Sequence, residues 1–119
     1  MIGVEVLGMA RPRAKNTKLV NELASYLRKI DLATDVVLYW NGKRMFVDSR
    51  RVEPCPDVKR FLEYGNPESV SMSFDAPLCD QMYYGEYGWG VQEHVRSLYE
   101  KYGYLMEFGH HWNVTGWDL

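Results

Sequence analysis

Hydrophobic residues recur along the first part of the chain with two different periods. Alternation of apolar and polar residues over positions 2–9 predicts a strand. Over residues 17–30 the apolar positions recur every three or four residues, which predicts an amphipathic helix with one buried stripe. Asn16 or Thr17 is the expected N-cap, because either side chain can accept a backbone N–H bond that the first helical turn leaves open.

The strongest local signal is the stretch DVVLYWNGKRMFVD, residues 35–48. Asn41-Gly42 supplies the two positive-φ positions of a type I′ turn, whose twist matches the strands it joins. A two-residue loop sets Trp40 opposite Lys43 and thereby fixes the register of the whole hairpin. Apolar side chains occur on both faces, so we expect this hairpin to lie inside a sheet with one face fully covered.

The remainder of the chain predicts four more elements and one irregular connection. In chain order these are a short helix at 57–64 ended by Gly65, a half-buried strand at 69–74, an irregular connection at 76–90, a helix at 91–103 and a closing strand at 106–114. Pro54 and Pro56 are expected to end the second hairpin strand. Alternation along the closing strand would point His110 toward the core and His111 toward solvent.

The predicted elements follow the order βαββαβ, and an additional C-terminal αβ unit follows them. That order predicts an α+β fold of the ferredoxin-like type, with helices covering one face of a mainly antiparallel sheet. A length of 119 residues suits one domain over positions 1–119 with one modest core. Such folds carry many unrelated functions, so the function has to be argued from particular residues.

The composition is that of a globular chain, with 46% hydrophobic and 25% charged residues, so disorder is not favoured. No apolar run approaches the ~18 residues of a membrane span, and no basic segment precedes the apolar start as in a signal peptide. We therefore expect a cytoplasmic protein that does not enter a membrane. Cys55 and Cys79 lie far apart and form no CxxC pair, which is typical of reduced, packed thiols.

Charge and aromatic residues are distributed unevenly along the chain. Residues 1–60 contain 12 Lys/Arg and 7 Asp/Glu, whereas residues 61–119 contain 2 and 9, so the halves carry net charges of +5 and −7. Ten of the aromatic residues follow position 80, in the acidic half. A split of this kind indicates an interaction function unless folding intermixes the two halves.

The stretch MYYGEYGWG, residues 82–90, is the best candidate for a binding surface. Tyrosine and tryptophan give a large contact area at small entropic cost, and glycine lets such a loop adapt to a partner. The predicted protein-binding residues, including two near the C-terminus, are Tyr83, Tyr84, Glu86, Tyr87, Trp89, His111 and Trp117. An alternative is that this loop covers the core as a lid.

These features predict a non-enzymatic protein-binding domain that docks on a larger protein with a basic surface. A small inhibitor or accessory factor, of the kind that viruses and mobile elements carry, is one form of this hypothesis. Association of two copies through the oppositely charged halves is a further option.

The first alternative is a nucleic-acid-binding module. Its basic residues lie in the loop before the first helix and in the hairpin: Arg11, Arg13, Lys15, Lys43 and Arg44. Tyr39 and Phe46 would share a hairpin face with Arg44 and could stack on bases. A net charge of −2 counts against this hypothesis, because only a local basic patch is available.

The second alternative is a small hydrolase-type enzyme centred on His110 or His111, with Asp75 or Cys79 as a partner. No sequence motif marks any of these residues as an activated nucleophile. The spacing of Cys and His residues matches no closed zinc pattern either. We therefore expect neither a metal nor another cofactor.

Overall fold

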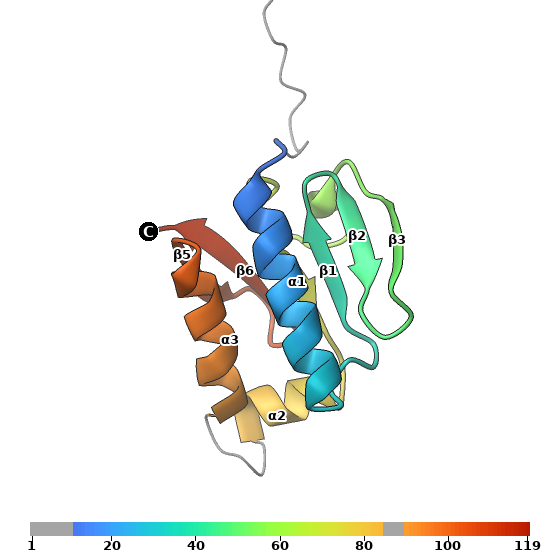
Figure 1. Cartoon of the computed structure of the whole chain (residues 1–119), viewed down its shortest axis with the longest axis vertical. Coiled ribbons are helices and arrows are strands. Elements are labelled where there is room, and N and C mark those ends of the chain that lie inside the picture. The colour runs from blue at the N-terminus through green and yellow to red at the C-terminus, as the bar shows by residue number, and fades with distance from the viewer. Residues whose placement is uncertain (1–10, 85–89) are drawn as a thin grey trace, which may run out of the picture.

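A computed structural model of the chain describes residues 11–84 and 90–119 (Figure 1). In chain order its elements are α1 (Ala14–Lys29), β1 (Val37–Trp40), β2 (Lys43–Phe46), β3 (Arg51–Pro54), the 3₁₀ helix η1 (Val58–Arg60), β4 (Ser71–Ser73), α2 (Leu78–Tyr84), α3 (Gly90–Lys101), β5 (Tyr104–Phe108) and β6 (Asn113–Asp118). The strands form one six-stranded sheet in the order β3-β2-β1-β4-β6-β5, and every pairing is antiparallel. The predicted α+β class and the antiparallel character of the sheet are confirmed.

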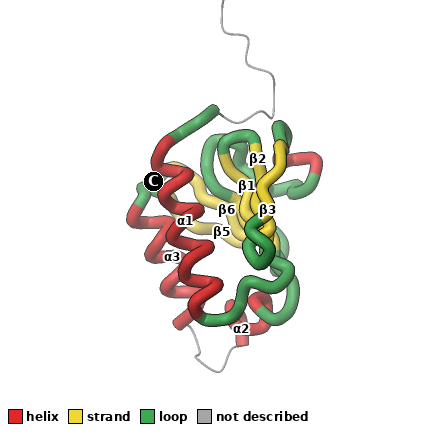
Figure 2. Tube along the Cα trace, turned by 45° about the vertical axis from the view of Figure 1, so that its right-hand side comes forward, coloured by secondary structure: helices red, strands yellow, loops and turns green. Residues whose placement is uncertain are grey.

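The main core lies between the sheet and the two longer helices, α1 and α3, which cross the same face side by side (Figures 1 and 2). Four adjacent strands contribute one row of helix-facing residues, Met45, Leu38, Met72 and Val114, which lie directly opposite one another. Each of the four is at most 8% exposed. The apolar stripe predicted for the first helix packs onto this row. It includes Leu19, Leu23 and Leu27.

The opposite side of the sheet, which we call the second face, carries a second and smaller cluster of buried residues. Tyr39 of β1 projects onto it and packs with Cys55, Val58 and Leu62, which belong to the segment that contains η1. The segment packs on β1, a central strand, whereas Leu105 of β5 and Trp117 of β6 remain 40% and 39% exposed. The hairpin therefore has apolar residues on both faces because one face joins the main core and the other joins this smaller cluster.

The hairpin has the predicted turn and register. Asn41 and Gly42 have φ angles of 48° and 78°, and Trp40 pairs with Lys43. The Val47 amide donates to the Val36 carbonyl at 3.0 Å and continues the pairing beyond the strands. The turn sequence alone was sufficient to define this element because the geometry it needs is local.

The ferredoxin-like strand order is not confirmed. The predicted first strand, residues 2–9, lies outside the described residues. The prediction that Pro54 and Pro56 end the second hairpin strand is wrong, because β2 ends at Phe46 and Pro54 instead ends a third strand, β3. Most of this edge strand is exposed, so its sequence shows no alternation of apolar and polar residues. The hydrophobic pattern therefore did not predict its pairing with β2.

The prediction of one closing strand over 106–114 is also wrong. The segment is a hairpin in which Phe108 of β5 pairs with Val114 of β6. The buried Asn113 shapes the intervening turn through two hydrogen bonds to His110. Its side-chain Oδ1 accepts from the His110 backbone N–H at 3.4 Å, and its backbone N–H donates to the His110 carbonyl at 3.1 Å. His110 and His111 consequently lie in a turn, where strand alternation does not determine the directions of their side chains.

The connection at 76–90 is partly helical rather than irregular. Its residues 78–84 form α2, in which Leu78 and Met82 are fully buried, and residues 85–89 lie outside the described part of the chain. The predicted helix at 57–64 shrinks to η1, with the Asp57 side chain accepting from the Lys59 amide at 3.1 Å. Burial of Leu78 and Met82 depends on contacts with distant segments, which local periodicity does not report.

The two longer helices were predicted with small errors at their ends. α1 follows Arg13 without a side-chain cap, and Asn16 is buried within its first turn rather than capping it. In α3 the fully buried ring is Tyr99, whereas Tyr102, predicted to face inward, is half-buried. The chain leaves α3 through Gly103 at φ 84°, as expected for a glycine stop. Among residues 11–84 and 90–119, every helix is too short or too polar to cross a bilayer.

We expect Leu38→Ala to lower the free energy of unfolding by about 2–5 kcal/mol, because it leaves a cavity in the middle of the helix-facing row. The matched control is Val52→Ala. Val52 continues the same row through Met45 at the open edge of the sheet and is 50% exposed, so this variant should stay within about 0.5 kcal/mol of the parent. Urea unfolding followed by circular dichroism measures both values. Equal midpoints for the two variants would contradict the assignment of the core.

Candidate docking surface

The aromatic loop predicted as the binding surface is described only at its beginning. Tyr83 belongs to α2, is half-buried and packs on Phe108 with ring centroids 5.1 Å apart. Tyr84 is the last residue of α2. Glu86, Tyr87 and Trp89 lie outside the described residues. Tyr83 therefore packs against the main core, and the remaining members of the loop stay a prediction.

A different apolar surface lies on the second face. The described part of the chain exposes six large hydrophobic side chains by more than a third of their area. Four of them belong to the second face and form what we call the apolar band: Phe61 at 49%, Tyr64 at 47%, Leu105 at 40% and Trp117 at 39% exposed. Sequence reasoning named only Trp117, because the exposure of the other three depends on how distant segments pack.

On one side of the band an arginine is fixed between two aromatic rings. The Arg44 guanidinium lies 4.4 Å from the ring centroid of Phe61 and 5.1 Å from that of Phe46. Its Nε and Nη2 atoms donate to one carboxylate oxygen of Glu53 at 2.7 and 2.5 Å. Arg51 lies over the Phe46 ring at 4.4 Å. Cation–π contact and ion pairing together hold this side of the surface in one arrangement.

On the other side of the band is a groove between Tyr64 and Trp117. It has a volume of about 260 Å³ and is lined by Tyr64, Glu107, Phe108, Gly109, Thr115 and Trp117. Glu107 lies directly opposite Thr115, and Leu105 lies opposite Trp117 in the β5–β6 ladder. A Cβ atom at position 109 would approach the Tyr64 Cβ to 2.7 Å. Glycine at that position therefore allows Tyr64 to lie against the hairpin turn.

His110 belongs to the packing beside this groove. Its ring stacks on Trp112 with centroids 5.1 Å apart, and the Tyr64 ring meets it edge-on at 5.0 Å. Its Nε2 atom lies 3.6 Å from a carboxylate oxygen of Glu63. His110 thus supports the position of Tyr64, which is a packing role.

His111 lies elsewhere, exposed in the β5–β6 turn. It lines a cavity of about 560 Å³ together with Asp75 and Cys79, the partners that the enzyme hypothesis requires. The Cys79 thiol donates to the His111 carbonyl, with sulfur and oxygen 3.5 Å apart. Burial and the nearby carboxylates of Asp80 and Asp75 raise the pKa of this thiol.

A raised thiol pKa is the opposite of what nucleophilic cysteines need, since the thiolate is the reactive form. The cavity beside His111 therefore brings the named residues together, but the environment of the Cys79 thiol does not favour its thiolate form. Within the described ranges, no three His, Cys, Asp or Glu side chains are grouped so that they could hold a metal ion.

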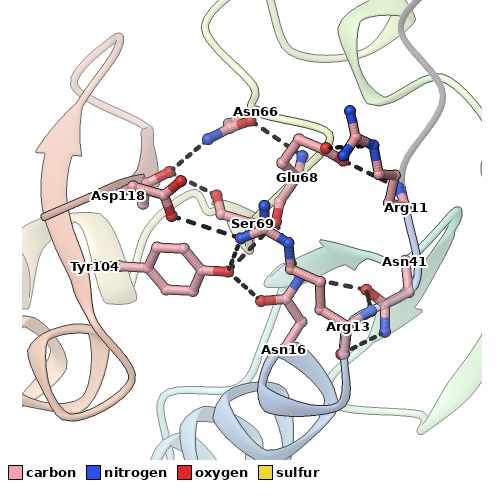
Figure 3. A network of polar contacts seen from close by, with 10 residues as sticks. Arg11, Arg13, Asn16, Asn41, Asn66, Glu68, Ser69, Tyr104 and Asp118 are labelled. Carbon is pink, nitrogen blue, oxygen red and sulfur yellow. Dashed lines mark hydrogen bonds and ion pairs between the residues drawn. The ribbon is translucent and has the colours of Figure 1, made fainter. Parts of the chain in front are cut away.

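The basic residues before and within the first turn of α1 have acidic or aromatic neighbours (Figure 3). Arg11 pairs with Glu68 at 3.1 Å, and Arg13 pairs with Asp118 at 3.5 Å. The Lys15 ammonium lies 4.3 Å from the ring centroid of Tyr104. Much of the positive charge proposed for nucleic-acid binding is therefore compensated by groups of the same chain.

The hairpin's basic residues are arranged in the same way. Lys43 lies over the Trp40 ring at 5.3 Å, and Arg44 is paired with Glu53 on the second face. The expected sharing of one face by Tyr39, Phe46 and Arg44 is observed. However, Tyr39 is only 6% exposed, so its ring is not available for stacking on a base.

The most extensive polar network lies at the start of α1 (Figure 3). Asn16 is fully buried, and its Oδ1 atom accepts a hydrogen bond from the Tyr104 hydroxyl at 2.5 Å. Its Nδ2 atom donates hydrogen bonds to Asn41 Oδ1 and to the Glu68 carbonyl, both at 3.2 Å. Asn41 also exchanges two 3.0 Å bonds with the backbone of Arg13. Every polar atom of the Asn16 side chain has a partner, so this network is structural. Sequence reasoning missed it because it interpreted Asn16 as a cap and Asn41 only as a turn residue.

A second set of bonds continues the network to the last strand. The Ser69 hydroxyl and the Asn66 side-chain amide both donate to the Gly116 carbonyl, at 2.5 and 2.9 Å. Gly116 itself lies against Tyr99, since a Cβ there would approach that ring to 2.9 Å. The loop before β4 is thereby fixed to β6, beside the strand residue that carries Trp117.

Comparison with protein-family models, with curated proteins and with solved structures finds no match. The function therefore has to be argued from the geometry of the chain itself.

We expect Tyr104→Phe to destabilise the protein by about 1–3 kcal/mol, because it leaves the buried Asn16 Oδ1 atom without its donor. Tyr102→Phe is the matched control. The Tyr102 hydroxyl bonds to Glu22 near the surface, where water can replace the bond, so its removal should destabilise the protein less. Chemical unfolding at neutral pH measures the difference. If Tyr104→Phe lowers the free energy of unfolding no more than Tyr102→Phe does, the network contributes little to stability.

Stability should also fall at alkaline pH because of Tyr99. Its hydroxyl donates to the Val70 carbonyl at 3.1 Å in a fully buried site, and burial raises its pKa far above the ordinary value. A raised folded-state pKa means that the stabilisation is complete below the unfolded-state pKa of about 10 and is lost as pH rises above it.

Urea unfolding of the parent and of Tyr99→Phe between about pH 8 and pH 11 measures this effect. The variant should be less stable at pH 8 but should lose stability less steeply as the pH rises. Parallel pH profiles for the two proteins would contradict the role assigned to Tyr99.

Proposed function

We propose that this chain is a non-enzymatic protein-binding domain that docks on a larger protein through the apolar band of its second face. One observation carries the proposal: Phe61, Tyr64, Leu105 and Trp117 stay 39–49% exposed on the sheet face that α1 and α3 do not cover. Apolar side chains grouped on one face of a small domain are typical of an interaction surface.

The residue types in and around the band support protein binding. Tryptophan, tyrosine and arginine dominate the energetics of protein interfaces, and all three are present here. Arg44 is already held by Glu53 and two rings, and Tyr64 is already held against Gly109 and His110. Side chains fixed before binding lose less conformational entropy when a partner arrives.

The charge beside the groove supports a partner with a basic surface. Glu107 lines the groove, and Glu63 lies beside His110, which packs on Tyr64. Opposite potentials accelerate association and set the orientation of the two proteins. A small inhibitor or accessory factor that covers a basic surface of a larger enzyme is the form of this proposal that the charge favours. The aromatic loop at 83–89 could extend such a contact, but the proposal does not depend on it.

The test is affinity capture from native lysate, with and without nuclease, using the parent and a triple variant. Phe61→Ser, Tyr64→Ser and Trp117→Ser together remove the three rings of the band while leaving the main core intact. We expect the parent to capture a specific protein and the triple variant to lose at least about tenfold of that capture, because interface rings each contribute on the order of 1–2 kcal/mol.

The control is the double variant Val52→Ser and Leu119→Ser, which removes the large exposed hydrophobic side chains outside the band in the part of the chain that the structure describes. It should capture the partner as the parent does, and circular dichroism should show all three proteins folded. Undiminished capture by the triple variant would contradict the proposal. Capture that disappears with nuclease would favour nucleic-acid binding instead, and concentration-dependent dimerisation lost in the triple variant would assign the band to a second copy of the chain.

A further inference from the structure

The groove between Tyr64 and Trp117 combines two aromatic side chains with a carboxylate. Tyr64 and Trp117 are 47% and 39% exposed, and Glu107, opposite Thr115 on the neighbouring strand, lines the same groove. The volume of about 260 Å³ is large enough for one long side chain and too small for a folded element. Aromatic faces and a carboxylate are the groups that recognise organic cations in proteins.

Glu107 is the exposed carboxylate of this groove, and no cation of the described chain is paired with it. The neighbouring acidic residue, Glu63, lies 3.6 Å from His110, whereas the lining of the groove contains no Lys or Arg. An apolar side chain placed here would take water from Glu107 without replacing its hydrogen bonds, which is unfavourable. A cationic side chain would pair with it.

We infer that this groove receives a lysine or arginine side chain of the docking partner. The aliphatic part of that side chain lies between the Tyr64 and Trp117 rings, and its charged end pairs with Glu107. The inference rests on the proposed function, and it specifies the chemistry of the partner at one point of the interface. It also gives Gly109 a role, because only a residue without Cβ lets Tyr64 form its wall of the groove.

Short blocked peptides serve as probes that do not require the partner. The uniformly ¹⁵N-labelled full chain is titrated to roughly 10 mM with acetyl-Gly-Lys-Gly-amide, acetyl-Gly-Arg-Gly-amide and the uncharged acetyl-Gly-norleucine-Gly-amide, since one side chain binds weakly. Both cationic peptides should shift the Trp117 indole and the Glu107 and Thr115 amide resonances, with a smaller effect at higher salt. The norleucine peptide should leave these resonances unchanged.

Two variants test the assigned groups. Glu107→Gln should weaken binding of the cationic peptides by about three- to tenfold, as expected for a partly exposed ion pair beside aromatic rings. Glu100→Gln, an exposed carboxylate of α3 away from the groove, should leave binding unchanged.

Equal shifts with the norleucine peptide, shifts centred outside the groove or no shifts at all would each overturn the inference. The peptide titration and the capture experiment fail independently. If capture depends on the apolar band but no peptide binds in the groove, the proposed function is supported. Only the inference that the groove receives a lysine or arginine side chain is then contradicted. Peptide binding without capture would support the groove and contradict docking through the band.

Discussion

The buried side chain of Asn16 is the interaction on which the arrangement of the chain depends. It connects α1 to three other segments, through the Tyr104 hydroxyl of β5, the Asn41 side chain of the first hairpin turn and the Glu68 carbonyl before β4. A buried amide without these partners would cost several kcal/mol, so only one placement of α1 satisfies it. Apolar contacts alone would let the helix slide along the sheet, whereas these directional bonds define its position.

The position of α1 also determines which face of the sheet remains exposed to solvent. α1 and α3 pack against each other and both lie on the same face, so within the described ranges the second face is covered mainly by the segment from Cys55 to Leu62. That segment is long enough to bury Tyr39 but too short to cover the strands on either side. Phe61 consequently remains at the surface beside Arg44 of β2, and Tyr64 remains at the surface beside β5 and β6.

The sequence predicted elements whose geometry is local and missed those that depend on distant contacts. Asn41-Gly42 was sufficient for the hairpin and its register, because a type I′ turn allows only one pairing. Strand β3 and the β5–β6 turn were missed, because one is an exposed edge and the other is shaped by the buried Asn113. The candidate surface was predicted only in part. Trp117 was named from its aromatic neighbourhood, but its association with Tyr64 arises from tertiary structure, through Gly109 and His110.

The two sides of the apolar band differ in charge, which has a consequence for how a partner can dock. Arg44 lies beside Phe61 and Arg51 lies over the neighbouring Phe46 ring, whereas Glu63 and Glu107 lie near Tyr64. A purely apolar surface would accept a partner in several orientations with similar energy. Opposite charges at its two ends penalise the reversed orientation, because that arrangement sets like charges against one another. Arg44 already has an internal carboxylate partner in Glu53, whereas Glu107 has none among the described residues, so the acidic end contributes more to this discrimination. In the groove at that end, Glu107 therefore contributes both to the binding of the partner and to its orientation.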